Sequence, residues 1–363
     1  MNHGNRGFTL IELMVAFGIL IIVSSVGFIS LSRYKGGQDI ELSMEEITSV
    51  IRDVQKRSIT EQDGKQWGIR FDNANSSYKI WSGSSYASGT VDRLYSLKRN
   101  IVFGNPSTST ADIIFSAISG KLSEPRILSL LNTKRDGIVG DIVMTERGTV
   151  TSRLEHGLVG YWHFDEAANT SIYDTSGFGN TGSASGTSWS TVSDCKAGSC
   201  LSFSASTQNV SITDQGSLDP QTTLTLTAWV YPTSVGGSDS ESTIIWGASP
   251  PAYYLSFNDS TLALDCYWYG TTPAGYHTTS AASVPLNKWS QVTCVWDGTN
   301  NIRYINGTSA GTTAVTGTGL SPTAVVIGAE NSTRQFVGKI DEVRIYNRAL
   351  SATEILNLYD DLK

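Results

Sequence analysis

Gly7-Phe8-Thr9-Leu10-Ile11-Glu12 opens an apolar run that continues to Leu31 and holds one charged residue, Glu12. As a helix rising about 1.5 Å per residue, the uncharged part at 13–32 would be roughly 30 Å long, which matches the apolar core of a bilayer. A carboxylate is costly in lipid, so Glu12 predicts a function within this segment beyond simple anchoring.

The segment from Arg6 to Val15 resembles the class III signal of type IV prepilins and pseudopilins. In that family a membrane-embedded prepilin peptidase cuts after the Gly, and the new N-terminal Phe is methylated. The resemblance therefore implies cleavage between Gly7 and Phe8, methylation of Phe8, and pairing of Glu12 with the N-terminal amine of a neighbouring pilin subunit. A secretory signal is instead cut after its apolar run, so this helix is expected to be retained. The alternative is an uncleaved anchor, in which Thr9 and Glu12 form only a capping box.

Charge is unevenly spread along the 363 residues, a length that suggests two or three domains. Residues 1–154 hold 18 Lys and Arg against 15 Asp and Glu, whereas residues 155–363 hold 8 against 18. The acidic second half argues against nucleic-acid binding through bulk charge. Lys134, Arg135, Arg147 and Arg153 are available to a DNA-binding pilin, but a solvated face explains these scattered residues more simply.

The predicted helix continues past the membrane segment to residue 64. Apolar residues recur at helical spacing on one face, and Asp63-Gly64 ends the pattern. These apolar residues are Ile40, Met44, Ile47, Ile51 and Val54. Strands are then predicted at 68–72, 78–82, 101–103, 113–116, 127–131, 138–144 and 150–154. This order of pieces is similar to minor pseudopilins of the GspH/FimT kind, and it implies an α+β pilin fold with a small antiparallel sheet.

Short alternating strands with frequent turn signals fill the rest of the chain and indicate an all-β sandwich. The stretches Leu158–Glu166, Tyr173–Gly182 and Phe336–Ser351 resemble the laminin-G-like, concanavalin A-type lectin/glucanase superfamily. The resemblance implies a jelly-roll domain whose first and last strands are neighbours, so that the domain can hang on one short linker.

All four cysteines lie in the second half: Cys195, Cys200, Cys266 and Cys294. An even number in an exported chain favours disulfides. Three pairings are compatible with the sequence, among them the sequential one, and free buried thiols are the alternative. The short, turn-rich loop from Cys195 to Cys200 makes a local bridge there reasonable.

An oxygen-rich loop contains Asp174, Ser176, Gly179 and Asn180, and such loops can wrap hard cations. Relatives in this superfamily often bind one Ca²⁺ here. The resemblance therefore implies a calcium site at Asp174 and Asn180, with Asp341 or Asp165 as a further ligand. An Asx-turn loop without an ion is the alternative.

No arrangement typical of an enzyme is found, so no catalytic residues are predicted. Glu241 and Glu330 lie in loop-like contexts rather than in a paired-carboxylate motif on a strand. The aromatic residues of Tyr253-Tyr254 and of 266–270 fit either sugar stacking or a sandwich core. The stretch 270–283, with Tyr276 and His277, is predicted as a loop at the rim, where ligands commonly bind.

The sequence thus predicts a leader (1–7), a helix (8–64, with 8–32 in the membrane), a pilin β domain (65–154) and a lectin-like sandwich (155–363). We expect a precursor in the cytoplasmic membrane that becomes a surface filament or pseudopilus subunit. Its sandwich would bind a glycan or a surface protein. The alternatives are a secretion pseudopilin that recognises secreted proteins and a DNA-uptake minor pilin.

Overall fold

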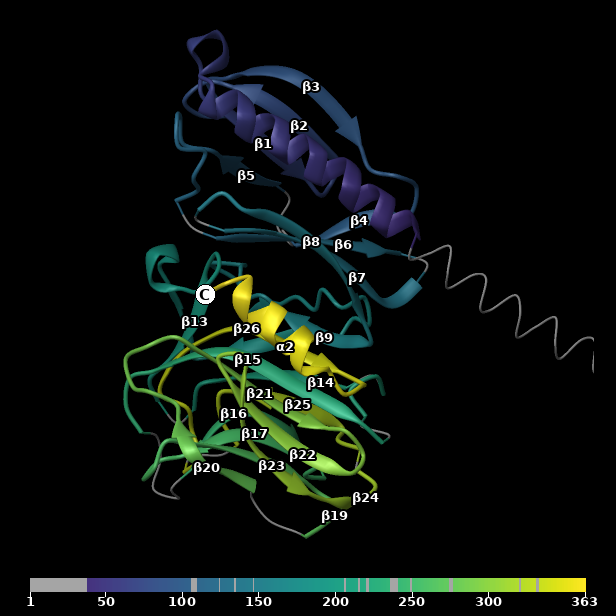
Figure 1. The fold of residues 1–363 in the computed structure, drawn as a ribbon, viewed down its shortest axis with the longest axis vertical. Helices are drawn as coiled ribbons and strands as arrows, with labels where there is room; N and C mark the ends of the chain where they lie inside the picture. Colours follow the sequence, from purple (N-terminus) through teal and green to yellow (C-terminus); the bar gives the residue numbers. More distant parts are fainter. Residues whose placement is uncertain are drawn as a thin grey trace, which may run out of the picture.

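The computed structural model describes residues 38–363 except 106–109, 124, 134, 146, 206, 215, 220–221, 236–240, 249, 274–276, 320 and 331–332. A helix-bearing domain lies at one end and a larger β-rich domain at the other, with helix α2 (Ala352–Asp360) at their junction (Figure 1). Within these residues no helix is both apolar and long enough to cross a membrane. Gly7, Phe8, Glu12 and the predicted membrane segment lie outside the described residues.

The first domain is built on a helix over residues 38–59, which lies against antiparallel strands (Figure 1). Its predicted apolar stripe is buried, with Ile40 and Val54 fully enclosed, and packs in one core with strand residues such as Phe71. Gly140 permits close approach, because an added Cβ there would lie 2.4 Å from Ile40 Cγ2 and 2.5 Å from Met44 Sδ. The 3-10 turn η1 (Gln62–Gly64) follows the helix.

The strands of this domain form one sheet of order β3-β2-β1-β5 and another of order β4-β6-β7-β8. Their bounds are β1 (Trp67–Asp72), β2 (Ser77–Ser82), β3 (Thr90–Ser96), β4 (Ile101–Asn105), β5 (Thr110–Ile114), β6 (Arg126–Asn132), β7 (Arg135–Met144) and β8 (Val150–His156). Six of the seven predicted strands lie within observed ones, whereas the strand predicted at 113–116 overlaps β5 only at residues 113–114. The prediction missed β3, because its residues are almost all exposed and show no alternation between buried and exposed positions.

The second domain is the predicted β-sandwich. The sheet farther from the first domain, called the distal sheet, has the order β10-β11-β14-β25-β16-β17-β18-β20. The proximal sheet has the order β12-β13-β26-β15-β21-β22-β23, and β9 pairs with β26. The remaining elements are β19 (Thr271–Thr272), which pairs with β24 (Thr316–Gly317), and the turn η2 (Val192–Asp194).

The strand bounds of the distal sheet are β10 (Ser171–Ile172), β11 (Gly182–Ser185), β14 (Asn209–Thr213), β16 (Glu241–Ala248), β17 (Tyr253–Asn258), β18 (Ala263–Trp268), β20 (His277–Ser283) and β25 (Ala324–Ile327). The strand bounds of the proximal sheet are β9 (Leu158–Trp162), β12 (Ser188–Ser190), β13 (Cys200–Phe203), β15 (Leu224–Pro232), β21 (Ser290–Trp296), β22 (Asn300–Ile305), β23 (Thr308–Ala314) and β26 (Gly338–Tyr346). β19 and β20 occupy much of 270–283, so the prediction of a loop there was wrong; Tyr276 lies outside the described residues.

The cysteines pair sequentially, which confirms the disulfides and settles the connectivity. Cys266 on β18 is bonded to Cys294 on β21, so this bridge joins the two sheets through the buried core. Cys195 is bonded to Cys200 and closes a short loop before β13.

The two faces of the sandwich have different surroundings. Val139 of β7 packs with Tyr304, Tyr346 and the α2 residue Ile355 in one buried cluster on the proximal sheet. The first domain and α2 therefore cover this sheet, and the distal sheet lies across the sandwich core from them. Gly157 alone separates β8 from β9, and the expected boundary at residue 155 falls within β8.

Candidate functional site

The loop that carries Asp174 closes onto β9 through its carboxylate. Asp174 Oδ1 accepts the backbone N–H groups of Tyr161 at 3.0 Å and Ser176 at 2.8 Å. Its Oδ2 accepts the Ser176 hydroxyl and the Asn180 N–H, both at 2.8 Å. A carboxylate has about four acceptor sites, so these donors occupy the positions that a metal would need.

Asn180 holds the same loop from its other side. Its side-chain amide donates to the carbonyl of Val159 at 2.8 Å and to Ser217 Oγ at 2.7 Å. The backbone carbonyl of Asn180 accepts the indole N–H of Trp162 at 2.9 Å. Asp174 and Asn180 thus come together as predicted, as a hydrogen-bonded brace.

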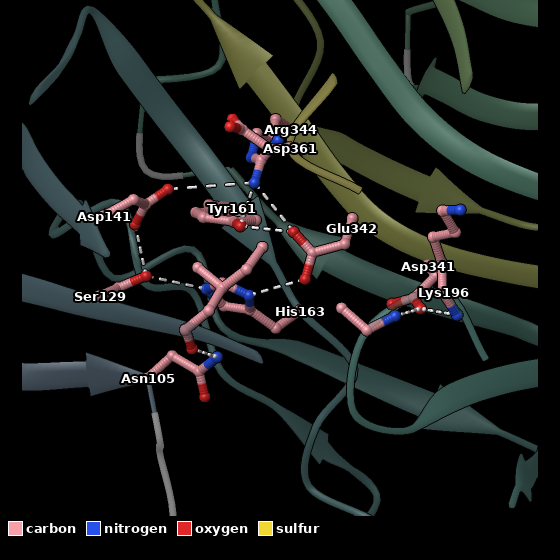
Figure 2. Close-up of polar contacts among 12 residues, drawn as sticks. Asn105, Ser129, Asp141, Tyr161, His163, Lys196, Asp341, Glu342, Arg344 and Asp361 are labelled. Atoms are coloured by element: carbon pink, nitrogen blue, oxygen red, sulfur yellow. Dashed lines mark hydrogen bonds and ion pairs between the residues drawn. The ribbon is translucent and has the colours of Figure 1, made fainter. Parts of the chain in front are cut away.

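Asp165 and Asp341 lie against the loop that the Cys195–Cys200 disulfide closes. Asp165 Oδ1 accepts the N–H of Ser199 at 2.8 Å. Asp341 Oδ2 accepts the N–H groups of Lys196 at 2.9 Å and Ala197 at 3.0 Å (Figure 2). Burial raises the pKa of Asp165 to about 6 and raises that of Asp341 well above its ordinary value.

These predicted calcium ligands do not fit a calcium site as a set. Asp174 and Asn180 brace one loop, whereas Asp165 and Asp341 brace another. Among the described residues, no group of three or more His, Cys, Asp and Glu side chains is placed to hold a metal ion.

A buried ionic network joins the two domains around Glu342 (Figure 2). Its Oε1 lies 2.9 Å from His163 Nδ1, and its Oε2 accepts the Tyr161 hydroxyl at 2.5 Å and Arg344 Nη2 at 2.9 Å. These four side chains are almost completely buried.

The first domain contributes the other side of this network. Ser129 Oγ donates to Asp141 Oδ1 at 2.6 Å and lies 3.1 Å from His163 Nε2. Asp141 Oδ2 is 3.9 Å from Arg344 Nη2. Across the domain boundary, Ser129 on β6 therefore contacts His163, and Asp141 on β7 lies near Arg344 on β26.

A neighbouring chain of contacts runs along β8. Glu155 accepts the Tyr346 hydroxyl at 2.8 Å and is paired with Arg153. Arg153 also contacts Asp361, just after α2. The last strand of the first domain is thus tied to β26 and to the C-terminal segment.

Charge balance in this network follows from opposing effects on each group. Burial alone would lower the pKa of His163, but the adjacent Glu342 carboxylate outweighs it and the pKa is raised. Burial alone would raise the pKa of Glu342, but His163 and Arg344 lower it. The pair therefore favours an imidazolium beside a carboxylate.

A β-bulge gives Glu342 its position. The pairing of β26 with β15 shifts register between Thr227 and Trp229, and Glu342 has a φ of 52° in the left-handed region. Such a backbone is strained for a residue with a side chain, by about 1–3 kcal/mol. Bulges re-aim side chains, and here the bulge lies where Glu342 meets His163.

The distal sheet carries a row of aromatic side chains on its outer face. The ring of Tyr254 on β17 lies 6.1 Å from that of Trp246 on β16 and 6.2 Å from that of Tyr267 on β18. Tyr269 follows β18, with its ring 4.4 Å from that of Tyr267. Tyr253 points inward to the core, as one of the two interpretations of the sequence expected, whereas Tyr254 lies on the outer face.

A pair of carboxyl groups lies beside this aromatic row. Glu241, the first residue of β16, is 8% exposed, and Asp265 on β18 is fully buried. Ser256 Oγ donates to Glu241 Oε2 at 3.1 Å. Burial, and then the contact with Glu241, raises the pKa of Asp265 to about 8. The prediction that Glu241 lies in a loop was wrong.

The sequence offered little sign of either cluster. The residues of the ionic network are separated by up to roughly 200 positions, and Glu241 and Asp265 stand on different strands. The alternation of Ser256 with Tyr254, and of Asp265 with Tyr267, was the one available signal, because alternate residues of a strand share a face.

Sequence comparisons match two parts of the chain. Residues 2–28 match the prokaryotic N-terminal methylation motif, and residues 204–356 match the concanavalin A-like lectin/glucanases superfamily. No curated relative matches the sequence. The chain thus carries a prepilin-type methylation motif near its N-terminus and a concanavalin A-like domain in its second half.

Several solved structures are similar to part of the chain. One is domain 4 of an extracellular arabinanase from Geobacillus stearothermophilus in complex with arabinotriose (20% identity, TM-score 0.44, covering 56% of this chain and 98% of that one). Another is the binding domain of Paraclostridial Mosquitocidal Protein 1 (16%, 0.46, 56% and 52%). A third is the botulinum neurotoxin serotype D ligand-binding domain in complex with N-acetylneuraminic acid (16%, 0.45, 56% and 50%). The chain spans about half the length of these two toxin domains, and likeness at this level carries no conclusion about a ligand.

Proposed function

We propose that the protein is a filament or pseudopilus subunit that presents its sandwich as an adhesive domain for surface carbohydrate. Cleavage after Gly7 and methylation of Phe8 would release the helix for assembly, with Glu12 meeting the N-terminal amine of a neighbouring subunit. The observation that carries the proposal is the presence of a prepilin-type motif and a lectin-like domain on one chain.

The placement of the domains supports outward display. The first domain, which continues from the N-terminal segment, covers the proximal sheet together with α2. The distal sheet lies on the other side of the sandwich core. A ligand surface there would point away from the helix that enters the filament.

The aromatic row on β16–β18 supports carbohydrate as the ligand. Aromatic faces stack on the apolar faces of sugar rings, and neighbouring polar groups orient the hydroxyls. Trp246, Tyr267 and Tyr269 are partly exposed, so they offer such faces. The proposed role is binding without catalysis.

Glycan-array binding of the full-length protein in detergent tests this role. Wild type should bind a defined set of glycans, and Trp246→Ala should lower that binding at least tenfold. Tyr173→Ala is the matched control, because Tyr173 is an exposed aromatic residue (43%) in the loop after β10, outside the aromatic row. Equal loss in both variants, or binding that is unchanged in Trp246→Ala, would rule out the aromatic row as the ligand surface.

A further inference from the structure

Glu241 and Asp265 form a buried acidic pair outside every site that the sequence predicted. Asp265 has no exposed surface, and its carboxyl contacts that of Glu241. Asp259 adds a further negative charge near Glu241. The pairing of Ser256 with Asp265 across β17 and β18 places the Ser256 hydroxyl at the same point of the sheet.

The pair differs from the other buried carboxylates in the hydrogen bonds that it accepts. Asp174 accepts four hydrogen bonds, and Asp341 accepts two backbone N–H groups. Neither oxygen of Asp265 accepts an N–H or O–H group. Buried polar atoms are normally satisfied, so an unpartnered buried carboxylate directed at a second carboxyl points to a missing positive partner.

The nearby arginines do not fill that place. Arg303 attracts Asp265, but its Nη2 donates to Thr313 Oγ1 at 3.2 Å, and its Nε and Nη1 have no hydrogen-bond partner. Arg334 acts on Glu241 and is paired with Glu330 at 3.1 Å. With Glu330 included, the four acidic groups Glu241, Asp259, Asp265 and Glu330 share these two guanidinium groups, which leaves an excess of two acids.

We propose that Glu241 and Asp265, together with the hydroxyl of Ser256, bind a divalent cation of the calcium type. Calcium takes six to eight oxygen ligands from carboxylates, other protein oxygens and water. The two carboxylates can supply up to four of these oxygens and Ser256 a fifth, and water completes the shell. The cation would lie beside the aromatic row, because Ser256 and Asp265 share a face with Tyr254 and Tyr267.

This site is separate from the one that the sequence implied. The carboxylate of Asp174 is already occupied by hydrogen-bond donors, and Asp341 braces the loop before β13. The two assignments therefore predict different sensitive residues. Trp246 stands on β16, the strand that begins with Glu241, and is the intended donor for a lanthanide probe.

The test uses full-length protein in detergent, treated with EDTA and titrated with Tb³⁺ and then with Ca²⁺. Wild type should show Tb³⁺ luminescence on tryptophan excitation, and Ca²⁺ should displace the probe. Glu241→Gln and Asp265→Asn should each weaken Ca²⁺ binding at least tenfold in calorimetry. Ser256→Ala should weaken it severalfold.

Two controls separate this site from other acidic groups. Asp341→Asn keeps an oxygen for the two N–H groups and should bind Ca²⁺ as wild type does, as should Glu45→Gln on the exposed face of the first helix. Near-ultraviolet circular dichroism of each variant checks folding. The proposal would be overturned if wild type bound no Ca²⁺. It would also be overturned if Ser256→Ala and Asp265→Asn both folded and bound Ca²⁺ as wild type does, or if only Asp341→Asn lost binding.

Discussion

The carboxylate of Glu342 lies 2.9 Å from the imidazole of His163, and both are buried where the two domains meet. His163 reaches Ser129 of the first domain with its other ring nitrogen. Through His163, Glu342 on β26 is therefore linked to Ser129 on β6 of the helix-bearing domain. Gly157 is the only residue between β8 and β9, so the two domains are connected directly at this buried interface, which we call the joint.

Removal of the Glu342 charge should weaken this joint. Glu342→Gln would leave His163 and Arg344 buried without their shared anion, and breaking a buried ion pair from one side costs about 3–5 kcal/mol. Guanidinium unfolding of the full-length protein followed by tryptophan fluorescence should show this loss. The exposed Glu45→Gln should change stability by less than about 0.5 kcal/mol. Equal stability of Glu342→Gln and wild type would show that the network does not hold the domains.

The His163–Glu342 pair should also make stability depend on pH. The pKa of His163 is raised above 6.5 in the folded protein. Its contribution is therefore complete below about pH 6.5 and is lost as pH rises through the folded pKa. Wild type should lose more stability than His163→Asn between pH 6 and pH 9, measured by unfolding at each pH. Parallel curves for the two proteins would contradict a charged His163.

The two disulfides should differ in their importance. In the chain-entropy account, the bridge across 28 residues stabilises by about 3.5 kcal/mol and the one across 5 residues by about 2 kcal/mol. The double variant Cys266→Ala/Cys294→Ala should therefore lose more stability than Cys195→Ala/Cys200→Ala. Mild reduction of the native protein, with alkylation mapped by mass spectrometry, should open the partly exposed Cys195 bridge first. Labelling of Cys266 before Cys195 would contradict the burial of the inter-sheet bridge.

Gly140 should be sensitive to substitution because the first helix rests on it. Gly140→Ala would place a methyl group within 2.5 Å of atoms of Ile40 and Met44. Overpacking of this kind costs about 1–3 kcal/mol. In a Met44→Ala background the loss should shrink, as a double-mutant cycle of unfolding free energies can show. A full, additive loss in that background would mean that the helix does not rest on Gly140 through Met44.

Local patterns predicted much of this fold because they depend on neighbours in sequence. The stripe from Ile40 to Val54 follows from burial of one helix face. In β15 the apolar residues face the sandwich core, and the alternating threonines are buried on the other face. The close spacing of Cys195 and Cys200 made a local disulfide a reasonable expectation. β3 escaped prediction since it buries almost no side chain.

The buried clusters of charged residues could not be predicted in the same way. Glu342 meets His163 only because β26 bulges and pairs with β9, which is a property of the assembled sheet. Asp265 meets Glu241 across three strands. The predicted calcium loop had the right residue types, but backbone N–H groups occupy the carboxylate of Asp174, and no sequence pattern shows where those donors point.

The most direct test of the central claim is the intact mass and N-terminal sequence of the protein recovered from sheared surface filaments, with Glu12→Val prepared alongside. A pilin-type subunit predicts a methylated Phe8 at the N-terminus in the sheared fraction, and a variant that is processed but stays in the membrane. Protein that begins at Met1, or that is found with an unmethylated N-terminus only in the membrane fraction and not in filaments, would contradict the account.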